Sequence, residues 1–341
     1  YLEIFWFASR THDKMTCAWI NHRLSKMLKS CRFISMEGNN IPFIGDISPD
    51  YPPTWLFGYP FTTEKKNTNS LSPWSLIWGN LKEFDNLLKN IDTENSSEKN
   101  SIVLINEQWL KLQKNNITVF SSIINNNISS HIHQDQGGIC LYYENFPILI
   151  DPGLWKYTWN NPIIRFQSGV SSHSTISINN IGLFPSKLSL LHPMNNYFSK
   201  YRINYKKIEN GYKYFMKGFR VLGRWLNWDR EVYVKRNELV INDYVDCPRK
   251  DEEIQISYVF DNKIKFNDQL TKGSNGIISF DLSIIGNTKE KSILPNTNKN
   301  IKSGYNSNYY GDLNPCKIIN LSFYSHDPLI ITTKYKFYRI S

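Results

Sequence analysis

The stretch SSHIHQDQGG places two histidines and an aspartate, His131, His133 and Asp135, at every second position. In an extended strand, side chains at positions i and i+2 point to the same face of the sheet, so these three would project together. Two imidazoles and a carboxylate are costly to bury unless they pair with one another or bind something. The spacing therefore indicates either a reactive or metal-binding centre or an ordinary polar edge of a β-sheet.

Two further polar residues follow this stretch. Asp151 ends the apolar run FPILI, where a hairpin between ICLYYEN and FPILID would return it beside the histidines. His173, in the segment SSHST, starts the next strand-like run. Two imidazoles and a carboxylate with an open fourth position suit zinc, which accepts nitrogen and oxygen ligands in a tetrahedral arrangement. The alternative is that the H-x-H pair is incidental and that DPG is only a turn sequence.

The elements that must position these residues are short strands. Beyond about residue 101 the chain consists of alternating runs bounded by Asn, Gly, Asp or Pro. Examples are ICLYYEN, FPILID, STISINN, YKYFMKGF, REVYVKR, ELVINDYVD, IQISYVF and YKFYRI. Because no helical pattern intervenes between them, these runs predict an antiparallel sandwich and not a parallel α/β sheet.

The N-terminal part of the chain predicts helices instead. Apolar residues recur at helical spacing near the N-terminus, with a break near Thr11 to Asp13. A Pro-rich loop, IPFIGDISPDYPPTWLFGYP, excludes a long helix, and Ser72 with the proline after it indicates the start of another one. We therefore expect an all-α piece, residues 1–91, followed by an all-β domain, residues 92–341, that begins with a polar linker.

The composition limits the possible function classes. The 341 residues suffice for two domains, and a start at Tyr1 instead of Met indicates a piece of a longer protein. A formal charge of +10 favours acidic partners such as nucleic acid, anionic lipid or acidic polysaccharide. Five scattered cysteines indicate neither a disulfide framework nor a cysteine-based zinc motif. No apolar run reaches the length of about 18 residues that a transmembrane segment needs.

Several motifs follow one another in an order that extends over nearly the whole chain, roughly residues 1 to 335. They are IPFIGDISPD, H-I-H-Q-D, LYYENFPILIDPG, Tyr157, Arg165, S-S-H-S-T-I-S-I-N, REVYVKRNELVINDYVD and SGYNSNYYG. This order resembles the heparinase II/III-like polysaccharide lyases, in which a helical toroid precedes a β-sandwich. The resemblance implies an α+β multidomain protein, the end of an (α/α) toroid followed by a large antiparallel β-sandwich.

The resemblance also implies roles for the histidines and the aspartate. His133, Asp151 and His173 match the zinc ligands of those family members that bind zinc, where the metal is mainly structural. His131 matches the catalytic histidine that faces the substrate. It would act as a base or neutralise a carboxylate, since the ordinary pKa range of histidine suits either role.

Three more residues become candidates for substrate binding. The guanidinium of Arg165 can hold a carboxylate with two hydrogen bonds, and the alternative for it is a surface arginine on a loop. Tyr157 belongs to the same run of motifs. Tyr310 can stack on a sugar ring, although aromatic residues in late strands usually belong to the core.

The activity that the resemblance implies is β-elimination on an acidic polysaccharide. A base removes the proton alpha to a uronic acid carboxylate, the 4-linked oxygen leaves, and the product is unsaturated. In the family, a tyrosine in an E-S-S-x-x-Y-like segment and an earlier Asn or Asn-His pair take part, and nothing before GDISPD matches them. We expect these groups upstream of Tyr1, so the chain as given would hold only part of the active site.

Two other function classes stay open at this point. One is a non-catalytic carbohydrate-binding or scaffold protein that keeps the fold and the zinc site. The other, a nucleic-acid binder, rests only on net charge and on a 14% aromatic content, and it lacks a recognisable binding module, so we predict no nucleic-acid partner. We expect a bacterial protein, periplasmic or extracellular, that acts on a glycosaminoglycan or an exported bacterial glycan. The sequence leaves the particular polysaccharide, endo or exo action and the oligomeric state open.

Overall fold

The structure is a computed structural model. It describes residues 11–20, 22–23, 101–105, 109–123, 133–156, 161–183, 202–219, 222, 225–246, 249, 252–287, 300–307, 313–324 and 328–340. The chain forms two compact units, residues 1–41 with 50–98 and residues 42–49 with 99–341. The other helices expected within residues 1–91, and the linker up to Asn100, lie outside the described residues.

In the first unit, the described residues form a short helix over 14–20 and 22–23. A turn at Thr11 and His12 precedes it, where the sequence predicts a break between two helices. Asp13 caps the helix, because its Oδ1 accepts a hydrogen bond from the Thr16 amide at 3.0 Å.

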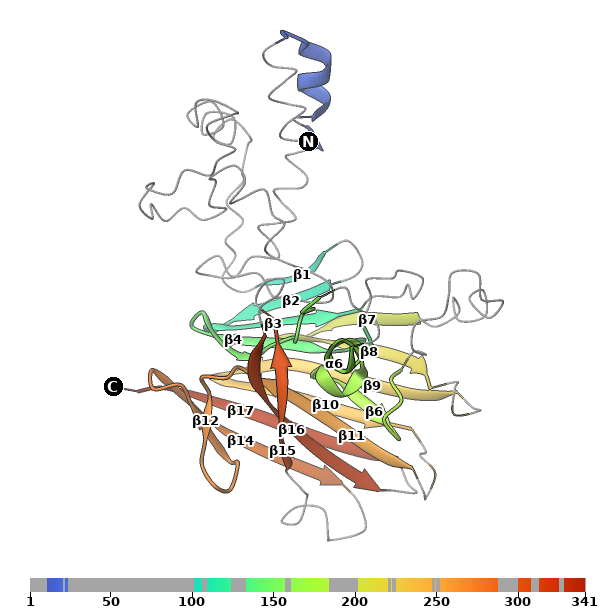
Figure 1. Ribbon diagram of the computed structural model, residues 1–341, viewed down its shortest axis with the longest axis vertical. Helices are drawn as coiled ribbons and strands as arrows, with labels where there is room; N and C mark the ends of the chain where they lie inside the picture. Colours follow the sequence, from blue (N-terminus) through green and yellow to red (C-terminus); the bar gives the residue numbers. More distant parts are fainter. Residues whose placement is uncertain are drawn as a thin grey trace. The chain divides into compact units, whose positions relative to one another are not determined.

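In the second unit, nine strands among the described residues form the first of two sheets (Figure 1). Their order is β1-β2-β3-β4-β5-β11-β16-β15, and β6 also pairs with β11. Every neighbouring pair is antiparallel. The strands are β1 (Ser101–Ile105), β2 (Trp109–Lys114), β3 (Ile117–Ser122), β4 (Ile139–Tyr143), β5 (Phe146–Leu149), β6 (Ile176–Ile178), β11 (Glu253–Phe260), β15 (Asn300–Asn306) and β16 (Asn314–Tyr324).

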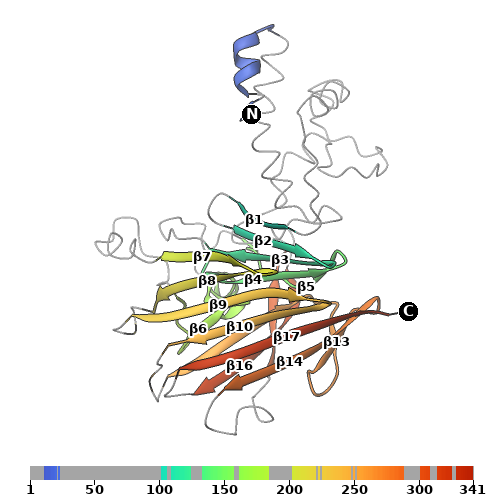
Figure 2. The ribbon, with the colours of Figure 1, turned by 180° about the vertical axis from the view of Figure 1, so that it is seen from behind.

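The second sheet has eight strands among the described residues and faces the viewer in Figure 2. Their order is β12-β13-β14-β17-β10-β9-β8-β7, and neighbours are again antiparallel. The strands are β7 (Arg202–Ile208), β8 (Gly211–Gly218), β9 (Leu226–Lys235), β10 (Glu238–Val245), β12 (Lys265–Phe266), β13 (Lys272–Ser274), β14 (Ile278–Asn287) and β17 (Leu329–Arg339).

The hydrophobic core lies between the two sheets. Buried side chains from both sheets form one continuous cluster, to which the first sheet contributes Leu141 and Ile256 and the second contributes Tyr212 and Trp228. In β9 buried residues alternate with more exposed ones, because successive side chains of a strand point to opposite faces. The second unit is therefore an antiparallel β-sandwich, and all eight runs named from the sequence lie on its strands.

A short helix departs from the sequence prediction. The expectation that no helix intervenes is wrong between β5 and β6, where α6 (Pro162–Ser168) and the 3-10 turn η1 (Val170–Ser172) lie. The Asn161 side chain caps α6 by accepting from the Ile163 amide at 2.8 Å. Phe166 of α6 packs against the face of the first sheet that turns away from the core, at Ile150, Val259, Cys316 and Ile318. A helix of seven residues is too short to show a helical period in the sequence.

Candidate metal centre

His133 and Asp135 lie in a loop that precedes β4, and not in a strand. Gly137 has a φ of +68°, and the amide of Gly138 donates to the Asp135 carbonyl at 2.7 Å. The two glycines therefore make a tight turn, since glycine adopts positive φ without strain. The expectation that His133 and Asp135 share one face of a strand is wrong for this reason. His131 lies outside the described residues.

The loop is fixed by hydrogen bonds to itself and to its neighbours. Within the loop, Nε2 of Gln136 donates to the His133 carbonyl at 3.0 Å. The Gly137 amide donates to the Ser122 carbonyl at 2.9 Å, which joins the loop to β3. The hydroxyl of Thr175 donates to the Gln136 carbonyl at 2.7 Å, which joins it to the segment that follows His173. These three contacts, within the loop, to β3 and to the segment after His173, together fix the position of the His133 backbone.

Asp151 follows β5 and lies at the open end of the β4–β5 hairpin. The hairpin turns at Glu144 and Asn145, whose φ values of +46° and +71° suit a two-residue turn, so the end of β5 returns to the start of β4. The hairpin predicted from the sequence is confirmed. Oδ1 of Asp151 accepts from the Gly153 amide at 3.3 Å, which stabilises the DPG turn, and Oδ2 is directed toward His173.

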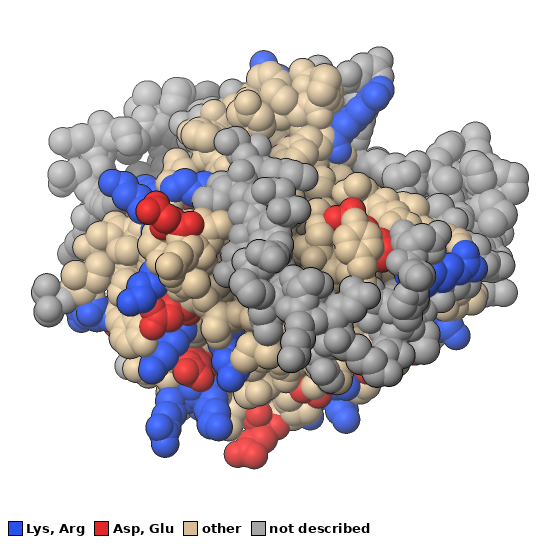
Figure 3. Space-filling view, turned by 90° about the horizontal axis from the view of Figure 1, so that it is seen from below, with Lys and Arg blue, Asp and Glu red and all other residues tan. Residues whose placement is uncertain are grey.

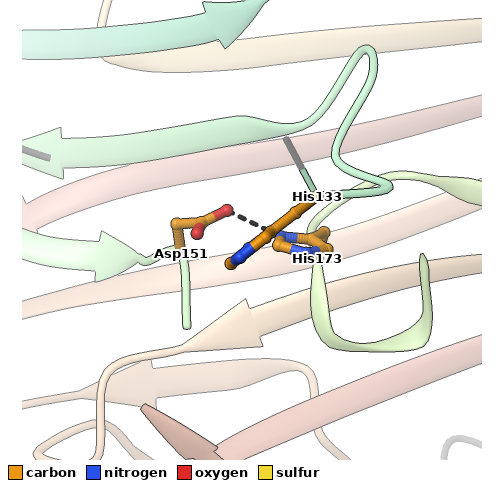
Figure 4. Close-up of side chains that lie close together, drawn as sticks. All are labelled: His133, Asp151 and His173. Carbon is orange, nitrogen blue, oxygen red and sulfur yellow. Dashed lines mark hydrogen bonds and ion pairs between the residues drawn. The ribbon is translucent and has the colours of Figure 1, made fainter. Parts of the chain in front are cut away.

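His173 ends η1 and leads into β6. Its amide donates to the Val170 carbonyl at 3.2 Å. The hydroxyl of Ser172 is bonded to the carbonyls of Gln167 and Gly169 at 3.0 and 2.8 Å. These bonds close the turn tightly, and the His173 side chain enters the interior at the same level as Asp151 (Figure 4).

The three side chains meet there. One possible ligand atom from each of His133, Asp151 and His173 lies within 4.8 Å of the other two. Nδ1 of His173 is 2.7 Å from Oδ2 of Asp151, and the centroids of the two imidazole rings are 5.3 Å apart. His133 is 2% exposed, His173 is 0% exposed and the Asp151 side chain is 7% exposed. This buried group could bind a metal ion.

A second buried carboxyl group, that of Asp135, interacts with this cluster. Burial raises the pKa of Asp135 to about 6; the charge of Asp151 acts in the same direction, while those of His173 and His133 oppose it. Burial lowers the pKa of His173, but the charge of Asp151 and its hydrogen bond outweigh burial and leave that pKa above its ordinary value. Two carboxyl groups that lie close together in a buried place thus favour the binding of a proton or another cation there.

The residues present fit a divalent metal ion. Nε2 of His173 is buried and has no hydrogen-bond partner among the described residues, which is costly unless the atom binds something. Imidazole nitrogen and carboxylate oxygen are ligands that zinc accepts, at about 2.0–2.2 Å. Such bonds would place the three ligand atoms about 3.3–3.5 Å from one another, so atoms that already lie within 4.8 Å of one another need only a small rearrangement. The cluster is buried, although three protein ligands leave a fourth coordination position for a further ligand.

Gln167 holds the segment that follows Asp151. Its buried Oε1 accepts from the Trp155 amide at 2.9 Å, and its Nε2 donates to the Ser307 hydroxyl at 3.1 Å. The Ser307 amide in turn donates to the Pro152 carbonyl at 2.8 Å. Gln167 is not among the residues predicted from the sequence. The sequence signal for its position is Asn161 followed by Pro162, which is typical of the start of a helix. Gln167 lies on the buried side of that helix, which is too short to stand out among the strand-like runs.

Comparison with known proteins identifies the family. A family model described as "Heparinase II/III-like, C-terminal" matches residues 105–322, which is more than half of the chain and includes the whole cluster. The chain belongs to the heparinase II/III-like family. None of the curated proteins compared with the chain matches it.

Solved structures share the fold of this heparinase II/III-like chain. A heparan sulfate lyase HepC mutant from Pedobacter heparinus has a TM-score of 0.67 at 12% identity and covers 100% of this chain and 51% of its own. The heparinase III-BT4657 gene product has a TM-score of 0.64 at 12% identity, over 92% of this chain and 46% of its own. A structure titled heparinase III has a TM-score of 0.59 at 13% identity, over 93% and 48%. The chain thus spans about half the length of these structures, and at this identity the likeness shows the fold alone.

Of the remaining site residues predicted for this heparinase II/III-like chain, Arg165 lies among the described residues, and it is not part of the cluster. Arg165 lies in the last turn of α6, with its side chain exposed to solvent. Tyr157 and Tyr310, like His131, lie outside the described residues, so their predicted roles stay predictions. No helix in the part of the chain that the structure describes is long and apolar enough to cross a membrane.

Proposed function

We propose that this protein is a polysaccharide lyase that cleaves a uronic-acid-containing acidic polysaccharide by β-elimination. The match of the family model over residues 105–322 carries the proposal, because the buried cluster of His133, Asp151 and His173 lies within it. Two solved structures with the same fold are titled as a heparan sulfate lyase and a heparinase III. Because the chain spans about half their length, the activity of the whole enzyme is part of the proposal.

We propose zinc as the ion that His133, Asp151 and His173 hold, in a structural role. When bound, zinc supplies two positive charges that offset the buried carboxylates of Asp151 and Asp135. The three ligands would hold the loop before β4, the end of the β4–β5 hairpin and the start of β6 in one arrangement. His131 precedes His133 by two residues, so the position of His131 depends on this arrangement.

The reaction needs a base for the proton alpha to the carboxylate, an acid for the leaving oxygen, and groups that neutralise the carboxylate as enolate character develops. We assign His131 the role of base or neutraliser. Arg165 would hold the substrate carboxylate with two hydrogen bonds, which its solvent exposure on α6 permits. Tyr157 and Tyr310 would contact the sugar.

The substrate class rests on the family and on these residues more than on a basic surface patch. The formal charge of +10 favours a polyanion. On the face drawn in Figure 3, however, the described Lys and Arg side chains lie among Asp and Glu side chains. We therefore propose a glycosaminoglycan or an exported bacterial polysaccharide as substrate, bound at a local site, and a periplasmic or extracellular location.

The test uses the protein together with any sequence that its gene places before Tyr1. It is incubated with a panel of uronic-acid polymers and, as control, a neutral polysaccharide, while the ultraviolet absorbance of the unsaturated product is followed. We expect absorbance to rise with at least one acidic polymer only. His131→Ala should lower the rate about 10²–10⁴-fold. Binding of a polymer without any rise in absorbance would show a carbohydrate-binding protein and overturn the lyase proposal.

A further inference from the structure

Arg230 carries a charge into the interior of the sandwich. It lies on β9, where the strand alternation turns its side chain toward the core, and it is 0% exposed. Its Nε and Nη2 donate to Oδ1 and Oδ2 of Asp243 at 2.6 and 3.1 Å. Asp243 lies opposite Arg230 on β10 and also accepts from the Trp228 indole at 2.8 Å. The guanidinium is therefore anchored within the second sheet.

The remaining guanidinium nitrogen forms hydrogen bonds with two segments that lead into strands of the first sheet. Nη1 of Arg230 donates to the carbonyl oxygen of Gly137 at 2.9 Å and to that of Ser174 at 3.3 Å. Gly137 belongs to the loop that contains His133, and Ser174 directly follows His173. One cation of the second sheet thus contacts both of the segments that carry the histidines of the cluster.

Further donors hold the same two carbonyl groups. The hydroxyl of Tyr214 donates to the Gly137 carbonyl at 3.0 Å. Burial raises the pKa of Tyr214 to about 12, so the hydroxyl stays protonated and remains a donor. The Ile139 amide donates to the Ser174 carbonyl at 3.3 Å. Side-chain and backbone donors therefore hold the Gly137 and Ser174 carbonyls where the His133 and His173 segments approach each other.

Stability alone is a weak reason for this arrangement. Taking two charges out of water costs so much that a well-packed apolar pair in place of a buried ion pair is often neutral or stabilising. Burial lowers the pKa of Arg230, but the charge of Asp243 outweighs it and leaves the pKa above its ordinary value, so the group is charged. A guanidinium provides a rigid planar set of hydrogen-bond donors with fixed directions, which an apolar side chain lacks.

We propose that Arg230 is the positioning residue of the metal centre, which sets the separation of the His133 and His173 segments through the Gly137 and Ser174 carbonyls. The proposal rests on the zinc site proposed above. Replacing residues that orient metal ligands without touching the ion typically weakens metal binding about 10–100-fold. Arg230 acts one step further away, on the backbone of the segments, so we expect the lower part of that range.

The first test removes both charges together. The double variant Arg230→Met, Asp243→Leu leaves neither charge unpaired in the core. Zinc affinity is measured by competition with a chelator, and the absorption spectrum of the cobalt-substituted protein reports the geometry of the ligands. We expect an affinity about tenfold weaker and a changed cobalt spectrum.

The matched control for the double variant is Lys213→Met, Asp229→Leu. This pair lies on the same sheet with its charged atoms 3.3 Å apart. Because Asp229 immediately precedes Arg230 on β9, its side chain points to the opposite face, away from the cluster. We expect the control to keep the zinc affinity and the cobalt spectrum of the wild type.

A milder pair of variants decides the question if the double variant does not fold. Tyr214→Phe removes one hydroxyl that bonds the Gly137 carbonyl, whereas Tyr258→Phe removes one that bonds the Thr333 hydroxyl at 2.8 Å, also between the two sheets. Both tyrosines are buried. We expect Tyr214→Phe to weaken zinc binding about fivefold and Tyr258→Phe to leave it unchanged.

The outcomes separate the two proposals. If the wild type binds zinc and the Arg230 and Tyr214 variants bind it with unchanged affinity and cobalt spectrum, the positioning role is wrong and the zinc site stands. If these variants weaken binding no more than their controls do, the effect is a general loss of stability, which equally overturns the positioning role. If the wild type binds no zinc, the zinc site is wrong and the role of Arg230 falls with it.

Discussion

Nδ1 of His173 lies 2.7 Å from Oδ2 of Asp151, although the two residues are 22 positions apart in the chain. Between them the chain forms α6 and η1 and then returns to the first sheet, so this contact closes the connection between β5 and β6. A carboxylate that holds one ring nitrogen of a histidine fixes the orientation of the ring and directs its other nitrogen. The geometry of the cluster therefore depends on how this long connection folds.

The loss of one ligand should empty the metal site. We predict that the purified protein contains zinc and that His133→Ala contains much less, because the two remaining ligands bind the ion more weakly than three. Elemental analysis of both proteins after exhaustive dialysis measures this. His12→Ala is the control, since His12 is exposed and lies outside the cluster, and it should keep the zinc of the wild type. Equal zinc in the wild type and in His133→Ala would refute the ligand assignment.

Without metal, the protein should lose stability as the pH rises. Burial raises the pKa of Asp135 to about 6, and the charge of Asp151 outweighs burial to raise that of His173. Both groups thus bind protons more tightly in the folded than in the unfolded state. The stabilisation is complete below the ordinary pKa of each group, about 3.9 for Asp and 6.5 for His, and is lost as the pH rises through the folded-state value. Urea denaturation of chelator-treated protein from about pH 4 to pH 8 measures this.

Asp135→Asn provides the control for this pH dependence. An amide resembles the protonated carboxyl group in shape and carries no charge, so the variant should lose the part of the slope below about pH 6. At pH 7 it should be more stable than the metal-free wild type, by on the order of 1–3 kcal/mol. With zinc bound the slope should reverse, because protons compete with the metal for imidazole. A metal-free wild type that gains stability over this pH range would contradict the prediction.

Gly137→Ala should destabilise the protein more than Gly276→Ala. Both glycines have positive φ, +68° and +91°, so alanine costs about 1–2 kcal/mol at either position. A Cβ at Gly137 would lie 2.7 Å from the ring of Trp228, which its bond to Asp243 holds in place. At Gly276 a Cβ would meet none of the described atoms within 4 Å. We expect a difference of about 1–3 kcal/mol in urea denaturation, and equal costs would show that the loop moves away from Trp228 without resistance.

Arg165 and Gln167 lie two positions apart on α6 and should separate substrate binding from stability. Gln167→Leu leaves the Trp155 amide and the Ser307 hydroxyl without this partner, at a cost of about 1–3 kcal/mol in denaturation experiments. Arg165→Gln changes an exposed side chain, so its cost should stay within about 0.5 kcal/mol. It should nevertheless weaken the binding, in titration calorimetry, of whichever uronic-acid polymer of the panel the wild type cleaves. Unchanged affinity would remove Arg165 from the proposed substrate site.

The strands could be predicted from the sequence because their physical cause is local. Alternation of apolar and polar residues and bounding turn residues suffice to locate runs such as ELVINDYVD, which becomes β10. The return of Asp151 toward β4 also followed from a local feature, the short hairpin turn at Glu144 and Asn145. That His173 meets this carboxylate did not follow from spacing; it came from the family resemblance, because the connection through α6 and η1 has no short-range signal.

The loop before β4 shows why other parts of the site could not be predicted. The alternation of His131, His133 and Asp135 imitates a strand, but Gly137 and Gly138 replace it with a turn whose form depends on Trp228 in the other sheet. Arg230 was hidden for a related reason. A charged residue in an alternating strand predicts a solvent-facing position, and only the tertiary structure shows the carboxylate and carbonyl groups that compensate its burial.

The burial of His133, His173 and Asp151 also bears on how fast an ion could exchange. Because these side chains are only 2%, 0% and 7% exposed, we expect an enclosed ion to leave mainly when the surrounding loops open. Its release rate would then be that of a local unfolding event and not of breaking metal–ligand bonds. Metal-bound and metal-free molecules would then interconvert slowly and persist as separate populations. Their proportions would depend on how much metal was present when the protein folded.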